Sequence, residues 1–247
     1  MTPTLLIVGC GGSGGWAVQM LAKSPNRDLA IILMDADRWE NRNLARNLIS
    51  MRDLGKPKVR TAGDVLRKAG WGGEILPRPR YLARGTDDWR ELLARPGQLR
   101  ILVCVDNHAG RRTCLELADG RAAAGLESVV VLTGNETKSA SADAYLPAWR
   151  GTPLDPRERY PEIKTDRAGD PLHPPCTGEA VAGNPQLALA NGLAAFSGLY
   201  LMETWAEEAP ARAGGEYAKE ITDRMPVSVQ WTATRQTSVS KGELDGR

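Results

Sequence analysis

A cluster of glycines has the spacing of a phosphate-binding turn. In "LLIVGCGGSGGWAV" (residues 5–18) an apolar run stops at the cluster and a helix-like pattern follows, and Gly9, Gly11 and Gly14 fit G-x-G-x-x-G, with Gly12 among them. Without side chains the backbone approaches a phosphate closely, and the start of the next helix favours negative charge. The alternative is a purely structural glycine turn, but the strand before it and the helix after it favour nucleotide binding.

An acid follows the second apolar run at a distance typical of nucleotide sites. Asp35 comes directly after residues 29–34, about 20 residues beyond the glycines, where a carboxylate accepts hydrogen bonds from both ribose hydroxyls. The glycine spacing and this acid fit NAD or FAD as well as ATP. An NAD-dependent oxidoreductase and an ATP-dependent enzyme therefore both remain open at this point.

Basic residues beyond Asp35 favour ATP. The segment "DADRWENRNLARN" brings Asn43 and Arg46, and "GKPK" brings Lys58. Phosphoryl and nucleotidyl transfer need cations because negative charge builds on the transferring group in the transition state, whereas a dinucleotide site has no general need for them. Each basic residue taken singly is more typical of a solvated surface charge, but their joint placement indicates triphosphate binding.

A second acid is placed where it can bind a metal ion. Asp106 is expected at the C-terminal end of the apolar strand Ile101–Val105, with Asn107 beside it; open α/β sheets bind ligands at that edge. Magnesium prefers oxygen ligands and commonly takes one or two carboxylates together with phosphate oxygens. The alternative for Asp106 is the N-cap of a helix that begins near Ala109, and the two roles are compatible.

The first 146 residues alternate strand-like and helix-like patterns. The predicted strands are Leu5–Val8, Leu29–Met34, Glu74–Pro77, Ile101–Val105, Ser128–Leu132 and Ala140–Leu146. Helices are predicted near Ser13–Lys23, Lys58–Ala69, Asp87–Ala94 and Ala109–Ala118. Runs such as "IILM" and "ILVCV" are apolar throughout, which indicates strands buried on both faces. The pattern predicts an α/β, doubly wound, mostly parallel, Rossmann-like sheet.

The chain changes character after the alternating part. Residues 147–176 are rich in proline and charge without a clear period, which predicts a long surface crossover loop. The part from 177 to 235 contains a predicted helix, Gln186–Glu207, and a predicted strand, Pro226–Trp231; the polar tail after Arg235 is expected to fray. We expect one adenylation domain over residues 1–247, with its nucleotide-binding half at about 2–146.

Composition excludes several classes of function. Apolar residues make up 42% and charged residues 25% of 247, and the net charge of +2 gives no electrostatic case for binding nucleic acid or a membrane surface. No apolar run is long enough for a membrane span, and the first ten residues lack the features of a secretory signal. The four cysteines are scattered and only two histidines occur, so neither zinc nor disulfides are expected. We expect a cytoplasmic protein.

Four motifs in order give the sequence a family resemblance. "GCGGSGG", "DAD…NRNLARN", "GKPK" and "VCVDNHAGRR" together resemble the ThiF/MoeB superfamily, ATP-dependent enzymes that activate ubiquitin-like and sulfur-carrier proteins, over about residues 4 to 135. The resemblance implies an adenylyltransferase that is a homodimer and uses ATP and Mg²⁺. It implies that Asp35 binds the ribose, that Asn43, Arg46 and Lys58 contact the triphosphate, that Asp106 coordinates magnesium with Asn107 beside it, and that Arg111 braces the site.

A cysteine after the crossover loop raises the question of a covalent step. Cys176 in "HPPCTGEAVAGNP" precedes helical sequence, and a helix N-terminus stabilises a thiolate. The alternative is a small buried apolar residue. The segment resembles the P-x-C-T motif of ubiquitin-activating members, which implies a thioester on Cys176, with His173 as a possible base; Cys10, Cys104 and Cys114 are expected to be packing residues.

The sequence also departs from longer members of the family. The first strand starts almost at Met1, so the arginine that an N-terminal helix lends to the neighbouring subunit in many bacterial members is expected to be absent or to come from elsewhere. The paired CxxC zinc site is missing as well. The hypothesis is ATP- and Mg-dependent adenylation of the C-terminal carboxylate of a small ubiquitin-like or sulfur-carrier protein; the alternatives are a nicotinamide-dependent oxidoreductase and an inactive nucleotide-binding module.

Overall fold

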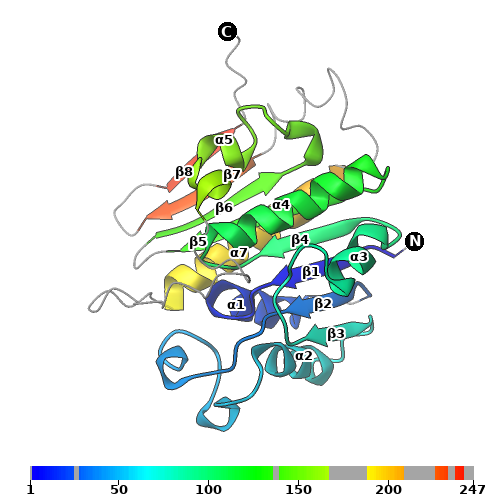
Figure 1. Cartoon of the computed structure of the whole chain (residues 1–247). Helices are drawn as coiled ribbons and strands as arrows, with labels where there is room; N and C mark the ends of the chain where they lie inside the picture. Colours follow the sequence, from blue (N-terminus) through cyan, green and yellow to red (C-terminus); the bar gives the residue numbers. More distant parts are fainter. Residues whose placement is uncertain are drawn as a thin grey trace.

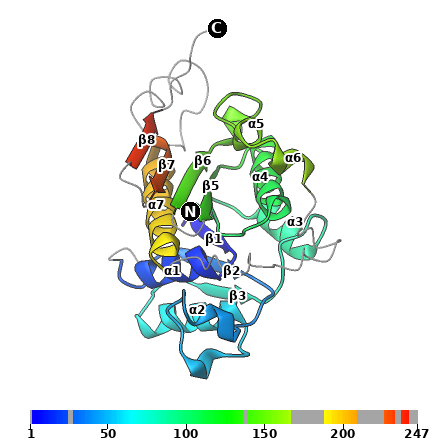
Figure 2. The same ribbon diagram turned by 90° about the vertical axis from the view of Figure 1, so that its left-hand side faces the viewer.

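In the part of the chain that the structure describes, one mixed sheet of eight strands has helices on both of its faces (Figures 1 and 2). The computed structural model describes residues 2–24, 28–135, 139–166, 188–208, 226–232 and 237–241. In spatial order the strands are β3 (Ile75–Arg78), β2 (Ala30–Met34), β1 (Thr4–Val8), β4 (Leu99–Val103), β5 (Ser128–Asn135), β6 (Ser139–Tyr145), β7 (Pro226–Thr232) and β8 (Thr237–Lys241).

Strands β3 to β5 of this spatial order are parallel, and β6, β7 and β8 continue the sheet in antiparallel pairs. All residues of β1 are buried, as a strand covered by helices on both sides requires. The predicted doubly wound, mostly parallel sheet is therefore confirmed. Its strand order reverses between β1 and β4, and in such sheets the ligand crevice lies outside the carboxyl ends of those two strands.

The helices divide between the two faces of the sheet. One face is covered by α1 (Gly12–Leu21), α2 (Lys58–Lys68) and α7 (Ala188–Glu208), and the other by α3 (Asp87–Ala94) and α4 (His108–Ala123) (Figure 2). Short helices complete the described chain: η1 (Asn41–Asn43), η2 (Met51–Asp53), η3 (Pro147–Trp149), α5 (Pro156–Arg159) and α6 (Glu162–Thr165). No helix in the described ranges has both the length and the apolar character needed to cross a membrane.

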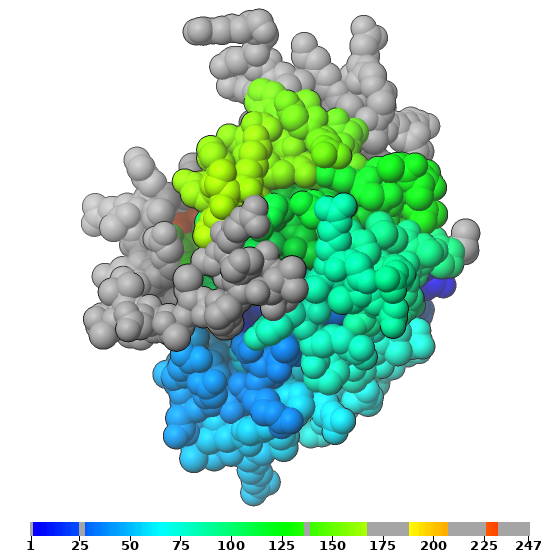
Figure 3. Space-filling view, viewed as in Figure 1, coloured from blue at the N-terminus to red at the C-terminus, as the bar shows by residue number. Residues whose placement is uncertain are grey.

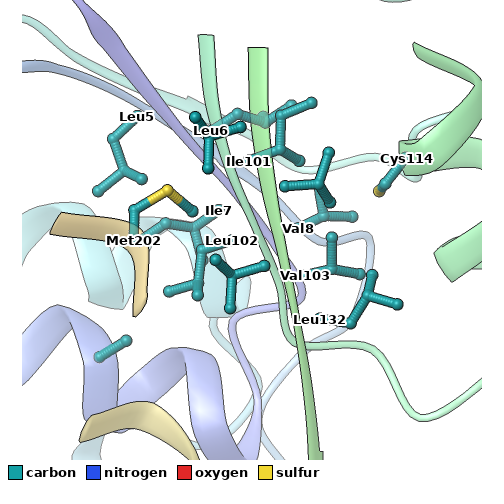
Figure 4. Close-up of a cluster of buried hydrophobic side chains, with 14 of the residues drawn as sticks. Leu5, Leu6, Ile7, Val8, Ile101, Leu102, Val103, Cys114, Leu132 and Met202 are labelled. Carbon is teal, nitrogen blue, oxygen red and sulfur yellow. The ribbon is translucent and has the colours of Figure 1, made fainter. Parts of the chain in front are cut away.

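The core consists of side chains that alternate across the parallel strands. On β1, Ile7 faces Met202 of α7 whereas Val8 points to the side of Cys114 of α4 (Figure 4). All four are buried, and each buried aliphatic side chain contributes about 1.5–3 kcal/mol relative to an exposed one. Burial on both faces fixes the position of β1 in the sheet, and therefore the place where the glycine loop begins.

A buried arginine connects segments at the amino ends of the strands, which is the end of the sheet away from the glycine loop. Arg121, fully buried in α4, donates hydrogen bonds to the carbonyl oxygens of Leu92 (2.6 Å), Arg95 (2.8 Å) and Gly97 (2.7 Å) and to Ser128 Oγ (2.9 Å). These partners lie before β4 and at the start of β5, at the amino ends of the strands. Arg121 therefore has a structural role away from the glycine loop.

The crossover region, predicted as a long surface loop, contains short helical turns in its described part, which the sequence did not predict. Residues 147–165 include η3, α5 and α6, and α6 packs on α4. In the space-filling view this yellow-green stretch lies at the surface, above the green part of the chain (Figure 3). Asp155 caps α5 by accepting from the Arg157 N–H at 2.9 Å, with Pro156 in the first turn. Arg112 of α4 donates to the carbonyl oxygens of Ile163 (2.9 Å) and Asp166 (2.8 Å). Tertiary contacts thus order turns too short to show a period.

Two further boundaries differ from the predictions. The strand expected at Ile101–Val105 is β4 and ends at Val103, so Asp106 lies in the turn before α4 and not at the strand tip. Of the tail after Arg235, which was expected to fray, residues Thr237–Lys241 form β8, which pairs antiparallel with β7. Backbone pairing with β7 needs no apolar alternation, and "TSVSK" shows too little of it to predict a strand.

Candidate functional site: the glycine loop and the ends of β2 and β4

The glycine turn links β1 to α1 and requires glycine where the backbone is crowded. Gly9 has φ +90°, and a Cβ on it would lie 2.7 Å from the carbonyl oxygen of Cys104. A Cβ on Gly14 would lie 2.9 Å from the carbonyl carbon of Gly9 and closer still to its oxygen. At the helix N-terminus, Gly11 is the N-cap and brings no side chain to its N–H groups. The first turn of α1 can therefore donate to an anion.

Asp35 is buried and tied to this turn. Its Oδ2 accepts from the backbone N–H of Cys10 at 2.7 Å and its Oδ1 from that of Asp37 at 2.8 Å. Burial raises the pKa of Asp35, while the Lys58 charge and the two backbone hydrogen bonds oppose the rise. Asp35 lies just after β2, as expected, and its carboxylate is next to the glycine loop.

Lys58 brings a positive charge to the same turn. It is the first residue of α2, and a Cβ on Gly11 would lie only 3.7 Å from its Nζ. The ammonium donates to Asp37 Oδ2 at 2.7 Å and lies 5.7 Å from the centre of the Trp39 ring. The predicted meeting of Lys58 with the glycine loop is thus present in the structure.

Arg46 and Asn43 come from the segment that follows β2. The Arg46 carbonyl accepts from Trp16 Nε1 of α1 at 3.2 Å and from Asn191 Nδ2 of α7 at 3.5 Å, which holds its backbone beside α1. Buried Asn43 uses its side-chain oxygen to accept from the Glu40 N–H at 2.9 Å in a capping box of η1. Contact of either side chain with a triphosphate stays a prediction.

The turn after β4 presents Asp106 at the same edge of the sheet. Asp106 is exposed, while Asn107 is the N-cap of α4 and accepts from the Gly110 N–H at 2.7 Å. The capping role considered for Asp106 thus belongs to Asn107, because the strand ends two residues early. Arg111 donates to the Thr133 carbonyl at 3.2 Å and so ties α4 to β5. Burial lowers the pKa of Arg111.

A magnesium ion at Asp106 would need ligands from the nucleotide. Within the described ranges, no three His, Cys, Asp or Glu side chains gather into a metal-binding group. An exposed carboxylate at the carboxyl ends of the strands fits the way in which magnesium is shared between a protein and substrate phosphates. The role of Asp106 as a metal ligand stays a prediction.

The cysteines differ in what the structure shows of them. Cys176 and His173 lie outside the described residues. Cys10 and Cys114 are fully buried and Cys104 is half-buried, so the predicted packing role is confirmed for the first two. Burial raises the pKa of all three thiols, that of Cys104 to about 12.

Sequence reasoning missed three residues of the site. Asp37 and Tyr81 form a hydrogen-bonded chain with Lys58, and Asn191 packs against the loop, since a Cβ on Gly12 would lie 3.0 Å from Asn191 Cγ. Asn135 Nδ2 donates to the Asn191 side-chain oxygen. The segment "DAD" places Asp37 two residues after Asp35, on the same side of an extended chain, and could have indicated it. Nothing local in the sequence singles out Tyr81 or Asn191.

Several solved structures share this fold. PaaA aligns with TM-score 0.60 and 16% identity over 98% of this chain and 64% of its own. E. coli MccB with ATP aligns with TM-score 0.57 and 19% identity over 96% of this chain and 63% of its own, and MccB with AMPCPP and MccA with TM-score 0.54 and 17% identity over 96% and 63%. The chain thus spans just under two thirds of the length of these structures, and the likeness shows the fold alone.

The sequence comparison is more specific. None of the curated proteins matches the chain. The model of the ThiF family matches residues 2–137, more than half of the 247 residues, and covers the glycine loop, Asp35, Lys58 and Asp106. The chain belongs to the ThiF family.

Proposed function

We propose that this protein transfers AMP from ATP to the C-terminal carboxylate of a peptide or of a small ubiquitin-like or sulfur-carrier protein. The main support is the Lys58 ammonium, 3.7 Å from a Cβ built on Gly11, at an uncapped helix N-terminus. A cation and helix N–H groups at one turn suit a triphosphate. Membership of the ThiF family favours this reaction over nicotinamide chemistry, which shares the glycine loop and Asp35.

In the proposed reaction an oxygen of the substrate carboxylate attacks the α-phosphorus of ATP. The bond from that phosphorus to the bridging oxygen breaks, and pyrophosphate leaves with the electron pair. Lys58 and Arg46 stabilise the negative charge that builds on the phosphates. Asp35 orients the ribose, and Asp106 would hold magnesium, which supplies further charge neutralisation when bound. The product is an acyl-adenylate.

The solved structures with the same fold guide the choice of substrate. MccB has been solved with ATP and with MccA, and this chain shares its fold. A peptide or a small protein with a free, extended C-terminus is therefore the substrate class that we propose. We propose that the protein acts as a homodimer, as the resemblance implies.

Exchange of labelled pyrophosphate into ATP tests the first step. With a candidate carrier present, the wild type is expected to show exchange, and Arg46→Ala and Asp106→Ala are each expected to lower its rate by about 100-fold. Arg42→Ala and Asp64→Ala are matched controls, because both residues form exposed ion pairs, with Glu40 and Arg67. The assignment would be contradicted if Arg42→Ala slowed exchange as much as Arg46→Ala, or if Asp64→Ala slowed it as much as Asp106→Ala.

The thioester step is a separate proposal. The Cys176 thiol loses its proton to solvent, and the thiolate sulfur bonds to the carbonyl carbon of the acyl-adenylate. The bond from that carbon to the AMP oxygen breaks, and AMP leaves. Cys176→Ala is expected to keep pyrophosphate exchange and to lose any thiol-reducible adduct between enzyme and carrier. An adduct that persists in this variant would show that another group is acylated.

Thiol labelling distinguishes Cys176 from the other cysteines. Because burial raises the pKa of Cys10, Cys104 and Cys114, these thiols stay protonated and unreactive below about pH 9. The native protein is therefore expected to react with one equivalent of a thiol reagent between pH 7 and 8, and Cys176→Ala with none; unfolding in urea should expose the rest. Labelling of the native Cys176→Ala variant would contradict this expectation.

A further inference from the structure

A hydrogen-bonded chain joins the glycine loop to the loop after β3. Lys58 Nζ donates to Asp37 Oδ2 at 2.7 Å, and the Tyr81 hydroxyl donates to Asp37 Oδ1 at 2.7 Å. Tyr81 lies 44 residues from Asp37 in the sequence and Lys58 lies 21, so three separate segments meet at one carboxylate. Both of its oxygens are fixed, one by each partner.

The Lys58 side chain is constrained on several sides. It is only 11% exposed, and its ammonium lies 5.7 Å from the centre of the Trp39 ring. The backbone N–H of Lys58 also donates to the Asp37 carbonyl at 2.9 Å. An ammonium has three N–H donors, and the bond to Asp37 leaves two for a phosphate at Gly11.

We propose that Tyr81 is a positioning residue for adenylation: by holding Asp37, it keeps the Lys58 ammonium at the glycine loop. The proposal rests on the proposed function for the part that Lys58 plays toward ATP. The Asp37 side chain is 48% exposed, so without Tyr81 its carboxylate keeps the bond to Lys58 but loses the hydrogen bond on its other oxygen, which fixes its orientation. A reorientation of Asp37 would shift the ammonium bonded to it relative to Gly11, and a misplacement of about 1 Å at a catalytic group lowers the rate.

The protonation states of Asp37 and Tyr81 suit this role. Burial raises the pKa of Asp37, but hydrogen bonds from Lys58 and Tyr81 outweigh it, and the net pKa lies below the usual range. Burial and the bond to Asp37 raise the pKa of Tyr81, and the charges of Asp35 and Asp106 add to the rise. At neutral pH, Asp37 is therefore a charged acceptor and Tyr81 a protonated donor.

Tyr81→Phe tests the proposal because it removes the hydroxyl and keeps the ring. Competitive acetylation with acetic anhydride, read by mass spectrometry, is expected to label Lys58 several-fold faster in the variant, with Lys56 as an internal reference. In pyrophosphate exchange, kcat is expected to fall about tenfold. This is the low end of the effect of removing a hydrogen bond to a group that positions a catalytic side chain. The change in KM for ATP should be smaller. A merely structural role would not change Lys58 labelling selectively.

Two controls make the test specific. Tyr200→Phe changes a tyrosine that is 49% exposed, against 50% for Tyr81, on α7, and should change neither readout. Adding Tyr81→Phe to Asp37→Ala should cause no further loss, because Tyr81 acts through Asp37.

The outcomes separate this proposal from the proposed function. Labelling does not depend on turnover, so unchanged Lys58 labelling in Tyr81→Phe overturns the positioning role even if the wild type catalyses no exchange. Faster labelling with unchanged kcat in an active enzyme would overturn its importance for the reaction. Absence of exchange in the wild type with every carrier would count against the proposed function alone.

Discussion

Replacing Gly14 by alanine is expected to weaken ATP binding by at least about 100-fold, which corresponds to about 2.7 kcal/mol. The new Cβ would lie 2.9 Å from the carbonyl carbon of Gly9 and closer to its oxygen. Both are backbone atoms, so the strain is relieved only by moving the turn or the start of α1. Either movement displaces the N–H groups that would bind phosphate. Isothermal titration with ATP and magnesium measures the loss.

Gly15→Ala is the matched control for this prediction. A Cβ on Gly15 would have its nearest contacts at 3.5 Å from Asn47 Oδ1 and 3.6 Å from the Cys10 carbonyl oxygen, which are ordinary van der Waals distances. Alanine also has a higher helix propensity than glycine, by about 1 kcal/mol. The variant is expected to bind ATP like the wild type and to unfold at an equal or higher Tm. Equal ATP affinities of Gly14→Ala and Gly15→Ala would show that phosphate does not bind at this turn.

The second large effect is expected for Lys58→Met, which should lower the rate of pyrophosphate exchange by about 10²–10³-fold. Methionine keeps most of the side-chain volume and removes the ammonium. The negative charges of Asp35 and Asp37 then lack the Lys58 ammonium that compensates them, and the transition state loses one of its proposed cations. The loss should be larger in kcat than in KM for ATP, because the charge on the phosphates increases during transfer.

Lys56→Met is the control, two residues away. Lys56 forms an ion pair with Asp53 at 3.1 Å and its side chain is 53% exposed, so its loss should change exchange less than twofold. Unfolding in urea checks that both variants are folded. A Lys58→Met enzyme with near-normal kcat would contradict the role of the ammonium in transfer.

The sequence by itself determined the features that depend on neighbouring residues. Apolar runs fixed seven of the strands to within two or three residues at most ends, and the glycine spacing fixed the turn between β1 and α1. The motifs from "GCGGSGG" to "VDN" indicated the ThiF family, since short stretches with strict backbone requirements keep their meaning out of context. Short or polar elements, α5, α6 and β8, were missed because tertiary contacts and strand pairing stabilise them, not a local pattern.

Only the tertiary structure decided which side chains meet at the glycine loop. The bonds from Lys58 and Tyr81 to Asp37 span 21 and 44 residues, and that from Asn191 to the Arg46 carbonyl spans 145. No periodicity encodes such contacts, because they depend on the strand order of the sheet and on the angle at which α7 packs beside α1. The sequence identified the residues able to bind a nucleotide, and the packing of the sheet and its helices determined which of them lie side by side.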